Sequence, residues 1–159
     1  MLSVVKPLNI ITSLVVHVRK ITELEKVLIQ KSKPPDEAAY FLKKGVKLSE
    51  EKKYVEAIAC YDKVIELNPR SKAAWYNKAL DSFHLDKYEE ALTCYEEAIR
   101  IDPTHSHSWC GKGVSCIRLK KIPEAVACFE EAVRLDPTDE IARQNKTTAL
   151  QWQKENRVE

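Results

Sequence analysis

The chain has 159 residues, of which 44% are hydrophobic and 31% are charged, as in globular proteins that bury a core. Its formal net charge of +2 provides no general attraction to nucleic acid, so we expect no nucleic-acid partner. Since it contains only three glycines, we predict a helical chain throughout.

Residues 1–35 form the first predicted domain, an N-terminal helix and a linker. From Ser13 onward, apolar residues recur every three to four positions, which predicts an amphipathic helix of about 18 residues ending near Lys31. Pro34 and Pro35 then stop the helix and make a stiff connector. The apolar stripe of this helix contains Leu14, Val18, Ile21 and Leu28, with Val15 and Leu24 beside it.

The longest apolar run of this segment, Leu8 to Val18, is too short for a membrane span, which needs about 18–20 residues. Arg19 and Lys20 follow it, where a signal peptide would have small residues for cleavage. We therefore expect neither a membrane span nor a signal peptide.

Three prolines, Pro69, Pro103 and Pro137, follow one another at intervals of 34 residues. Before them stand three similar segments: AIACYDKVIELN, ALTCYEEAIRID and AVACFEEAVRLD. In each segment an alanine, an aromatic residue and a small apolar residue are spaced by four and three, which places them on one helix face. A period of this length predicts helical units that stack on one another.

The first half of each unit has an aromatic residue followed, four positions later, by a small one that lets a neighbouring helix approach closely. Tyr54, Tyr88 and Ile122 then start the second helix after a short polar turn. The aromatic and small residues are Phe41 and Gly45, Trp75 and Ala79, and Trp109 and Gly113.

These residues resemble the tetratricopeptide repeat (TPR) family, whose 34-residue pattern contains an aromatic residue, Leu-Gly, Tyr, Ala, an aromatic residue, Ala and Pro. The second predicted domain, residues 36–139, holds three such repeats at 38–71, 72–105 and 106–139. The resemblance implies an all-α fold, a right-handed α-solenoid of three helix-turn-helix repeats with an N-terminal helix and a C-terminal capping helix.

A further helix is expected after the third repeat. Residues 140–159 form the third predicted domain, a capping helix that begins after Thr138 and Asp139. Its expected apolar stripe consists of Ile141, Asn145, Thr148 and Trp152, with Ala142 and Ala149 alongside.

Within the repeats, the family's leucine is replaced by Lys44, Lys78 and Lys112, which we expect to weaken packing locally.

In this family the first helices of the repeats line a concave groove, and the resemblance carries that role to one face of this chain. The face is largely apolar, so we expect a protein or peptide partner whose apolar or amphipathic segment fills it, with Tyr76, Asn77 and His84 supplying hydrogen bonds. The predicted groove residues are Leu42, Val46, Tyr76, Asn77, Leu80, Phe83, His84, His107, Cys110, Val114 and Ile117.

Some members of the family clamp the C-terminal carboxylates of heat-shock chaperones with lysine, asparagine and arginine. The matching residues here are Leu42, Val46, Asn77, His107 and Gly111, and only Asn77 agrees. The positive charge that holds a carboxylate pair is missing, so we do not expect a co-chaperone of that type.

Three of the five cysteines, Cys60, Cys94 and Cys128, occupy equivalent repeat positions. Stacked helices lie roughly 8–10 Å apart, farther than the ~7 Å that a disulfide tolerates between Cα atoms. We therefore expect buried thiols in a reducing compartment and a cytoplasmic location.

Motifs for catalysis are missing: there is no phosphate-binding loop, nucleophile elbow or Cys-x-x-Cys pair. His105, His107 and Cys110 are close in sequence but lack a second ligand pair at metal-site spacing. We predict a non-enzymatic protein-interaction module without metal or cofactor.

The role of the N-terminal helix stays open at this point. It could cover the exposed edge of the first repeat or fill the groove. The alternative function is a self-assembling structural or scaffold protein, a homo-oligomer formed through residues 13–31. A third reading, from the lysine and arginine excess of residues 1–35, is an accessory at a membrane surface.

Overall fold

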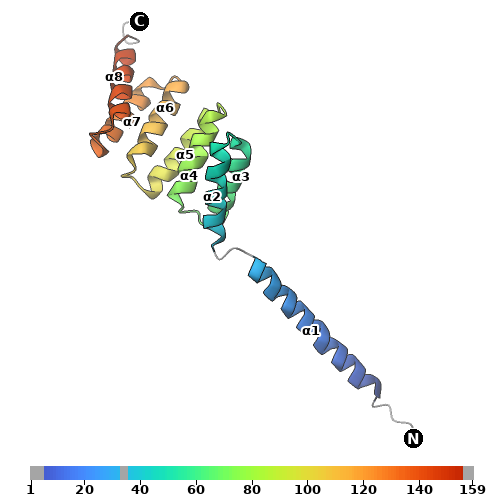
Figure 1. The fold of residues 1–159 in the computed structure, drawn as a ribbon. Coiled ribbons are helices and arrows are strands. Elements are labelled where there is room, and N and C mark those ends of the chain that lie inside the picture. The colour runs from blue at the N-terminus through green and yellow to red at the C-terminus, as the bar shows by residue number, and fades with distance from the viewer. Residues whose placement is uncertain (1–5, 33–35, 156–159) are drawn as a thin grey trace. The chain divides into compact units, whose positions relative to one another are not determined.

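The computed structural model of the protein describes residues 6–32 and 36–155. Within these two stretches every regular element is an α-helix (Figure 1). The chain divides into two compact units, residues 1–37 and residues 38–159. Each unit has its own structure and is described separately.

The first unit contains helix α1, Lys6–Ser32, which is longer than the predicted helix. The helix begins at Lys6, before the apolar pattern that starts at Ser13, and Pro7 lies in its first turn, where a missing N–H costs no hydrogen bond. Side chains from 13 to 26 are all exposed, among them Leu14, Val18 and Ile21. In the described part of the chain, no helix combines the length and hydropathy needed to cross a membrane.

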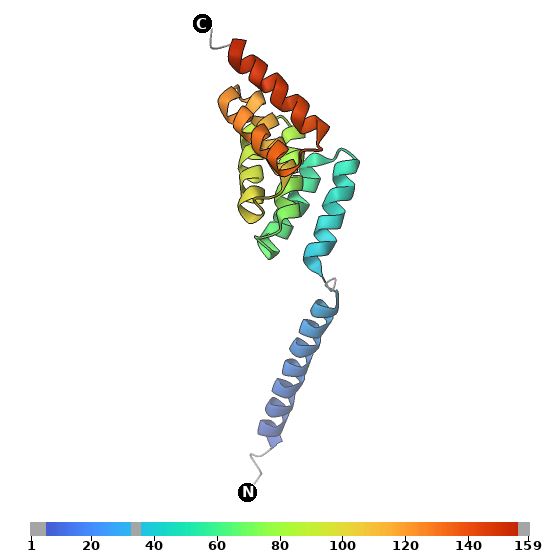
Figure 2. The same cartoon turned by 90° about the vertical axis from the view of Figure 1, so that its left-hand side faces the viewer.

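The second unit is a succession of seven helices in which each packs against the next (Figures 1 and 2). The expected all-α solenoid of helix pairs is confirmed. The helices are α2 (Glu37–Glu50), α3 (Tyr54–Leu67), α4 (Lys72–His84), α5 (Tyr88–Ile101), α6 (Ser106–Arg118), α7 (Ile122–Leu135) and α8 (Glu140–Glu155).

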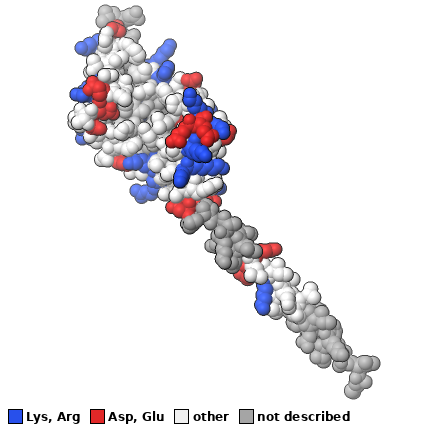
Figure 3. Space-filling view, in the orientation of Figure 1, with Lys and Arg blue, Asp and Glu red and all other residues white. Residues whose placement is uncertain are grey.

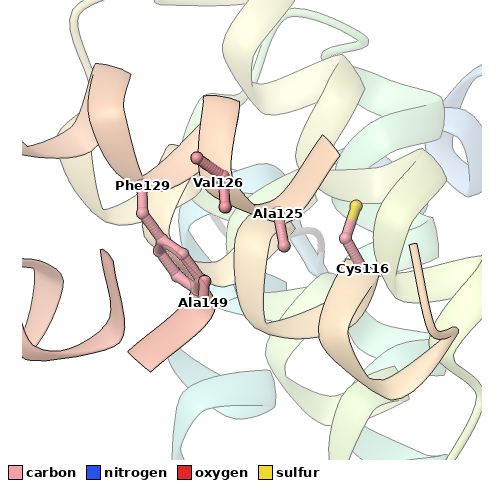
Figure 4. Close-up of a cluster of buried hydrophobic side chains, with 5 residues drawn as sticks. All are labelled: Cys116, Ala125, Val126, Phe129 and Ala149. Carbon is pink, nitrogen blue, oxygen red and sulfur yellow. The ribbon is translucent and has the colours of Figure 1, made fainter. Parts of the chain in front are cut away.

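Inside each hairpin a buried aromatic ring of the second helix lies against a small residue of the first. A Cβ atom built on Gly45 would lie 2.5 Å from Cε1 of Tyr61, and one on Gly113 would lie 2.6 Å from Cε1 of Phe129. Both rings are about 1% exposed. The small residues therefore allow the close helix approach that the sequence predicts, and Figure 4 shows Phe129 in the cluster of the third hairpin.

The turn inside each hairpin contains a non-glycine residue in the left-handed backbone region. Lys52, Asp86 and Lys120 have φ angles of 60°, 59° and 59°. Around Lys120 the first helix ends with two reversed hydrogen bonds, Lys121 N to Cys116 O at 2.8 Å and Lys120 N to Ile117 O at 3.0 Å. This pattern satisfies the last carbonyls of α6 and is usually built with glycine.

The lysines that replace the family's leucine do not leave a gap in the packing. Lys78 Nζ lies 2.6 Å from Asp62 Oδ1 of the preceding repeat, and Lys112 Nζ lies 2.9 Å from Glu96 Oε1. Lys78 and Lys112 therefore each join two repeats by a half-buried ion pair, whereas the expected local weakening of packing stays a prediction. Acidic and basic side chains accordingly lie intermixed on the repeats in Figure 3.

Helix α8 packs against α7 and α6 at the end of the array. Asp139 caps it, because its Oδ1 accepts hydrogen bonds from the backbone N–H of Ile141 at 2.9 Å and of Ala142 at 3.1 Å. Ala142 and Ala149 are buried, whereas Ile141 and Trp152 are 66% and 41% exposed. The predicted stripe is therefore wrong for Ile141 and Trp152, whereas the two alanines expected beside it form the buried face.

We predict that Lys120→Gly stabilises the protein, because an L-residue at φ 59° carries backbone strain that glycine lacks. The free energy of unfolding should rise by about 1 kcal/mol in urea titrations followed by circular dichroism. Lys121→Gly is the matched control: Lys121 has φ −88°, so glycine there should bring no gain. Equal changes in the free energy of unfolding for the two variants would contradict the proposed backbone strain at Lys120.

Candidate peptide-binding face

The first helices of the repeats and α8 lie side by side in one layer. Ser49 of α2 donates a hydrogen bond to Asp81 Oδ1 of α4 at 2.6 Å. Helix α4 contacts α6 directly. Asn145 of α8 then donates to Cys110 Sγ of α6 at 3.8 Å. The layer therefore continues from the first repeat to the capping helix.

We use the term candidate groove face for the eleven predicted groove residues, all of which lie on α2, α4 and α6. Val46, His84 and His107 are exposed, and the other eight are half-buried. The half-buried ones are Leu42, Tyr76, Asn77, Leu80, Phe83, Cys110, Val114 and Ile117.

The apolar members of this face also contribute to the core. Leu42 packs against the buried cluster around Tyr61, and Leu80 packs against the cluster around Tyr95. Val114 packs in the same way against the cluster around Phe129. These side chains present only part of their surface to a partner, so the face is less apolar than a count of its residues indicates.

A cluster of aromatic and imidazole rings lies where α4 meets the start of α6. Tyr76 contacts His105 edge to face, with ring centroids 5.0 Å apart, and His107 follows at 5.7 Å from His105. Burial raises the pKa of Tyr76. Burial, and then the charges of Lys72 and His107, lower the pKa of His105. At neutral pH Tyr76 and His105 therefore offer neutral hydrogen-bonding groups.

His105 also binds within its own turn, since its Nδ1 lies 2.7 Å from Ser108 Oγ. No group of three His, Cys, Asp or Glu side chains that could hold a metal ion occurs in the part of the chain that the structure describes.

At the other end of α4 and α6, aromatic stacking joins successive repeats. His84 stacks on Tyr54 of the preceding repeat, with centroids 4.9 Å apart and planes at 14°. One repeat later, the guanidinium of Arg118 lies 5.6 Å from the Phe83 ring and 5.8 Å from the Tyr88 ring. Sequence reasoning missed this role of Tyr54 and Tyr88, although their 34-residue spacing carried the signal.

Sequence reasoning also missed Asn145 as a neighbour of the candidate groove face. Its amide reaches Cys110, whose pKa is raised chiefly by burial. The sequence signal was weak because Asn145 belongs to the capping helix, outside the three repeats.

Gly111 of α6 lies directly against the Tyr95 ring. A Cβ atom built on it would lie 2.6 Å from Cε1 and 2.7 Å from the hydroxyl oxygen of Tyr95. Tyr95 is 1% exposed, so its ring would have to shift within the core to make room. A side chain at residue 111 is therefore disfavoured by this packing.

Comparison with protein-family models agrees with this geometry. The model described as tetratricopeptide repeat matches residues 73–105 and 107–139, and a second model of the same description matches residues 38–71. The chain belongs to the tetratricopeptide repeat family. Together the matches cover more than half of its length.

Among solved TPR structures, two similar ones contain bound peptides. The first TPR of Spaghetti (RPAP3), bound to the HSP90 peptide SRMEEVD, has a TM-score of 0.70 and 26% identity, over 72% of this chain and 90% of that one. The second TPR domain of human RPAP3, in complex with the HSP70 peptide SGPTIEEVD, has a TM-score of 0.68 and 28% identity, over 70% of this chain and 93% of that one.

Two further similarities support the fold alone or cover a short stretch. The Sgt2 TPR domain from Aspergillus fumigatus has a TM-score of 0.74 at 19% identity, over 80% of this chain and 85% of that one. An uncharacterised protein of Methanocaldococcus jannaschii is 44% identical over 43 residues. That match spans 27% of this chain and half the length of the archaeal protein.

We predict that Gly111→Ala destabilises the TPR array, although alanine is the better helix former. The added methyl group must displace the buried Tyr95 ring, so the free energy of unfolding should fall by roughly 1–3 kcal/mol. Asn77→Ala, at the equivalent position of the second repeat, is the control and should change it much less. Chemical denaturation of all three proteins measures the difference, and a neutral Gly111→Ala would contradict the steric closure.

Proposed function

We propose that the protein is a non-enzymatic interaction module that binds an apolar or amphipathic segment of a protein partner along the candidate groove face. The observation that carries the proposal is the composition of this face. Apolar side chains alternate along it with neutral hydrogen-bonding groups, Tyr76 and Asn77 among them. Membership of the TPR family, with relatives solved in complex with peptides, supports an interaction role.

The partner differs in chemistry from the peptides in those two structures, which end in EEVD. Such a terminus carries several carboxylates, and these are best held by lysine or arginine. The five clamp positions of this chain provide no such charge, and Tyr95 fills the space beside Gly111. We therefore expect the EEVD peptides to bind weakly or not at all.

The spacing on α4 and α6 suits a partner with apolar side chains at helical intervals. Leu80 and Phe83 are three residues apart, as are Val114 and Ile117 on the neighbouring helix. Two adjacent rows of this kind can receive the apolar face of one amphipathic helix. The neutral imidazole of His105, with Tyr76, can bind polar groups at the edge of that segment.

The proposal predicts that peptides with a defined apolar pattern can be selected from a library by their binding to this protein. A random peptide library displayed on phage should yield ligands with apolar residues at intervals of three or four when it is selected on the full chain. Val46→Glu with His107→Glu should weaken the selected peptides at least tenfold in fluorescence anisotropy. Both residues are exposed, so the charges interfere with binding without entering the core.

Thr93→Glu, on the exposed face of α5, is the control and should leave affinity unchanged. Ligands that end in acidic residues, or that bind the double variant as tightly as the native chain, would refute the assignment of this face. Circular dichroism of each variant verifies that the helices are intact.

Self-assembly through α1 is a second candidate function. The observation in its favour is the exposure of apolar side chains on one stripe of this helix, with Leu14 at 62% and Val18 and Ile21 at 54% each. Isolated apolar residues are common on surfaces, but a stripe along a helix is typical of helix association. A scaffold role and a cytoplasmic location, which the five free thiols favour, belong to the same proposal.

Under this second candidate, Val18→Glu with Ile21→Glu should convert an oligomer of the full chain to a monomer in multi-angle light scattering. Val16→Glu with Arg19→Gln changes the net charge equally on the opposite side of α1 and should leave the mass unchanged. A native chain that is monomeric at high concentration would eliminate self-assembly and leave peptide binding untouched.

A further inference from the structure

A pocket of about 480 Å³ lies on the side of the array formed by α5, α6 and α7. None of its lining residues belongs to the candidate groove face. Trp109 and Lys112 of α6 and Glu96 of α5 surround it, and both Cys116 and Cys128 contribute to its lining. Two thiols from different helices therefore meet beside one pocket.

The two thiols are partners of each other. Cys116 of α6 and Cys128 of α7 are 1% and 4% exposed, and each side chain shifts the pKa of the other across the third hairpin. Both thiols line the same pocket. Figure 4 shows Cys116 in the buried cluster of this hairpin, beside Ala125 of α7.

The pair is peculiar to the third repeat. Cys60 and Cys94 occupy the position of Cys128 in the first and second repeats, but the residues equivalent to Cys116 there are Leu48 and Ser82. The chain thus contains one dithiol and two matched single thiols in the same fold. A comparison of these thiols separates the effect of pairing on their oxidation from the effect of burial.

The surroundings shift the pKa values of the two thiols in opposite directions. The hydrogen bond from Cys128 lowers the pKa of Cys116, and the charge of Lys112 lowers it further. The same hydrogen bond, with burial, raises the pKa of Cys128. Cys116 therefore ionises first, while Cys128 keeps its proton and donates it. By contrast, burial raises the pKa of the single thiol Cys94 to about 11.

We propose that Cys116 and Cys128 form a redox-active dithiol, which hydrogen peroxide converts to a disulfide that joins α6 to α7. A peroxide molecule is little larger than water, so the pocket is large enough to hold it beside both residues. The thiolate is the reactive form of cysteine, and a nearby second thiol traps its first oxidation product.

The reaction proceeds in two balanced steps. The Cys116 thiolate attacks one peroxide oxygen, the O–O bond breaks, and the departing hydroxide takes up a proton to become water, which leaves a sulfenic acid on Cys116. Cys128 then loses its proton, its sulfur attacks the Cys116 sulfur, and the S–O bond breaks to release a second water. Two electrons pass from the two thiols to the peroxide.

The disulfide would constrain a helix that takes part in the candidate groove face. Cys116 lies between Val114 and Ile117 on α6, whereas Cys128 lies on α7. A covalent bond between the two helices removes conformational freedom from the third hairpin and resists its opening. Thiol reductants reverse the bond, so the hairpin has two interconvertible states.

The test is peroxide oxidation of the full-length chain, followed by non-reducing peptide mapping in a mass spectrometer. The expected product is a Cys116–Cys128 crosslink with the loss of two hydrogen atoms, restored by dithiothreitol. Cys60→Ser and Cys94→Ser should form it as fast as the native chain. In Cys128→Ser, the sulfenic acid should persist on Cys116 and be captured by dimedone.

Ser82→Cys provides a gain-of-function test that does not depend on removing a buried thiol. It recreates the pair with Cys94 in the second repeat, where Lys78 replaces Lys112, and should add a second crosslink. The proposal is overturned if peroxide leaves Cys116 and Cys128 reduced. It is equally overturned if the single thiols Cys60 and Cys94 oxidise first.

Discussion

Close contact between an aromatic ring and a small residue holds each hairpin together, and the rest of the array depends on it. Tyr61 and Phe129 are buried directly against Gly45 and Gly113, so the two helices of a hairpin approach to a distance that no side chain at those glycines would permit. Packing at this density fixes the rotation of each helix about its axis. That rotation decides which residues of α2, α4 and α6 remain accessible on the candidate groove face.

The same rings limit what the face can bind. Tyr95 belongs to the core of the second hairpin, yet its hydroxyl oxygen occupies the space into which a side chain at residue 111 would extend. Core packing thus disfavours a basic side chain at residue 111, and neutral groups such as Tyr76 and His105 lie on the same helix layer. Core and site are not independent in a fold whose helices each contribute to both.

The repeats were predictable from sequence because a 34-residue period repeats each local signal three times, as Tyr61, Tyr95 and Phe129 illustrate. Features that occur only once in the chain were harder to predict from the sequence. The buried stripe of α8 was misplaced, since a polar helix offers several weak stripes and only its neighbours select Ala142 and Ala149. Contacts between repeats, such as His84 on Tyr54, depend on stacking geometry that spacing alone does not contain.

The ion pairs between repeats all have the same orientation along the array. Each pair joins a carboxylate on the second helix of one unit to a lysine on the first helix of the next: Asp62 to Lys78, Glu96 to Lys112 and Glu130 to Lys146. A unit with a lysine on one side and a carboxylate on the other is complementary to copies of itself. Tandem duplication of such a unit would insert it with both borders already matched, so an array of this kind can lengthen without evolving a new interface.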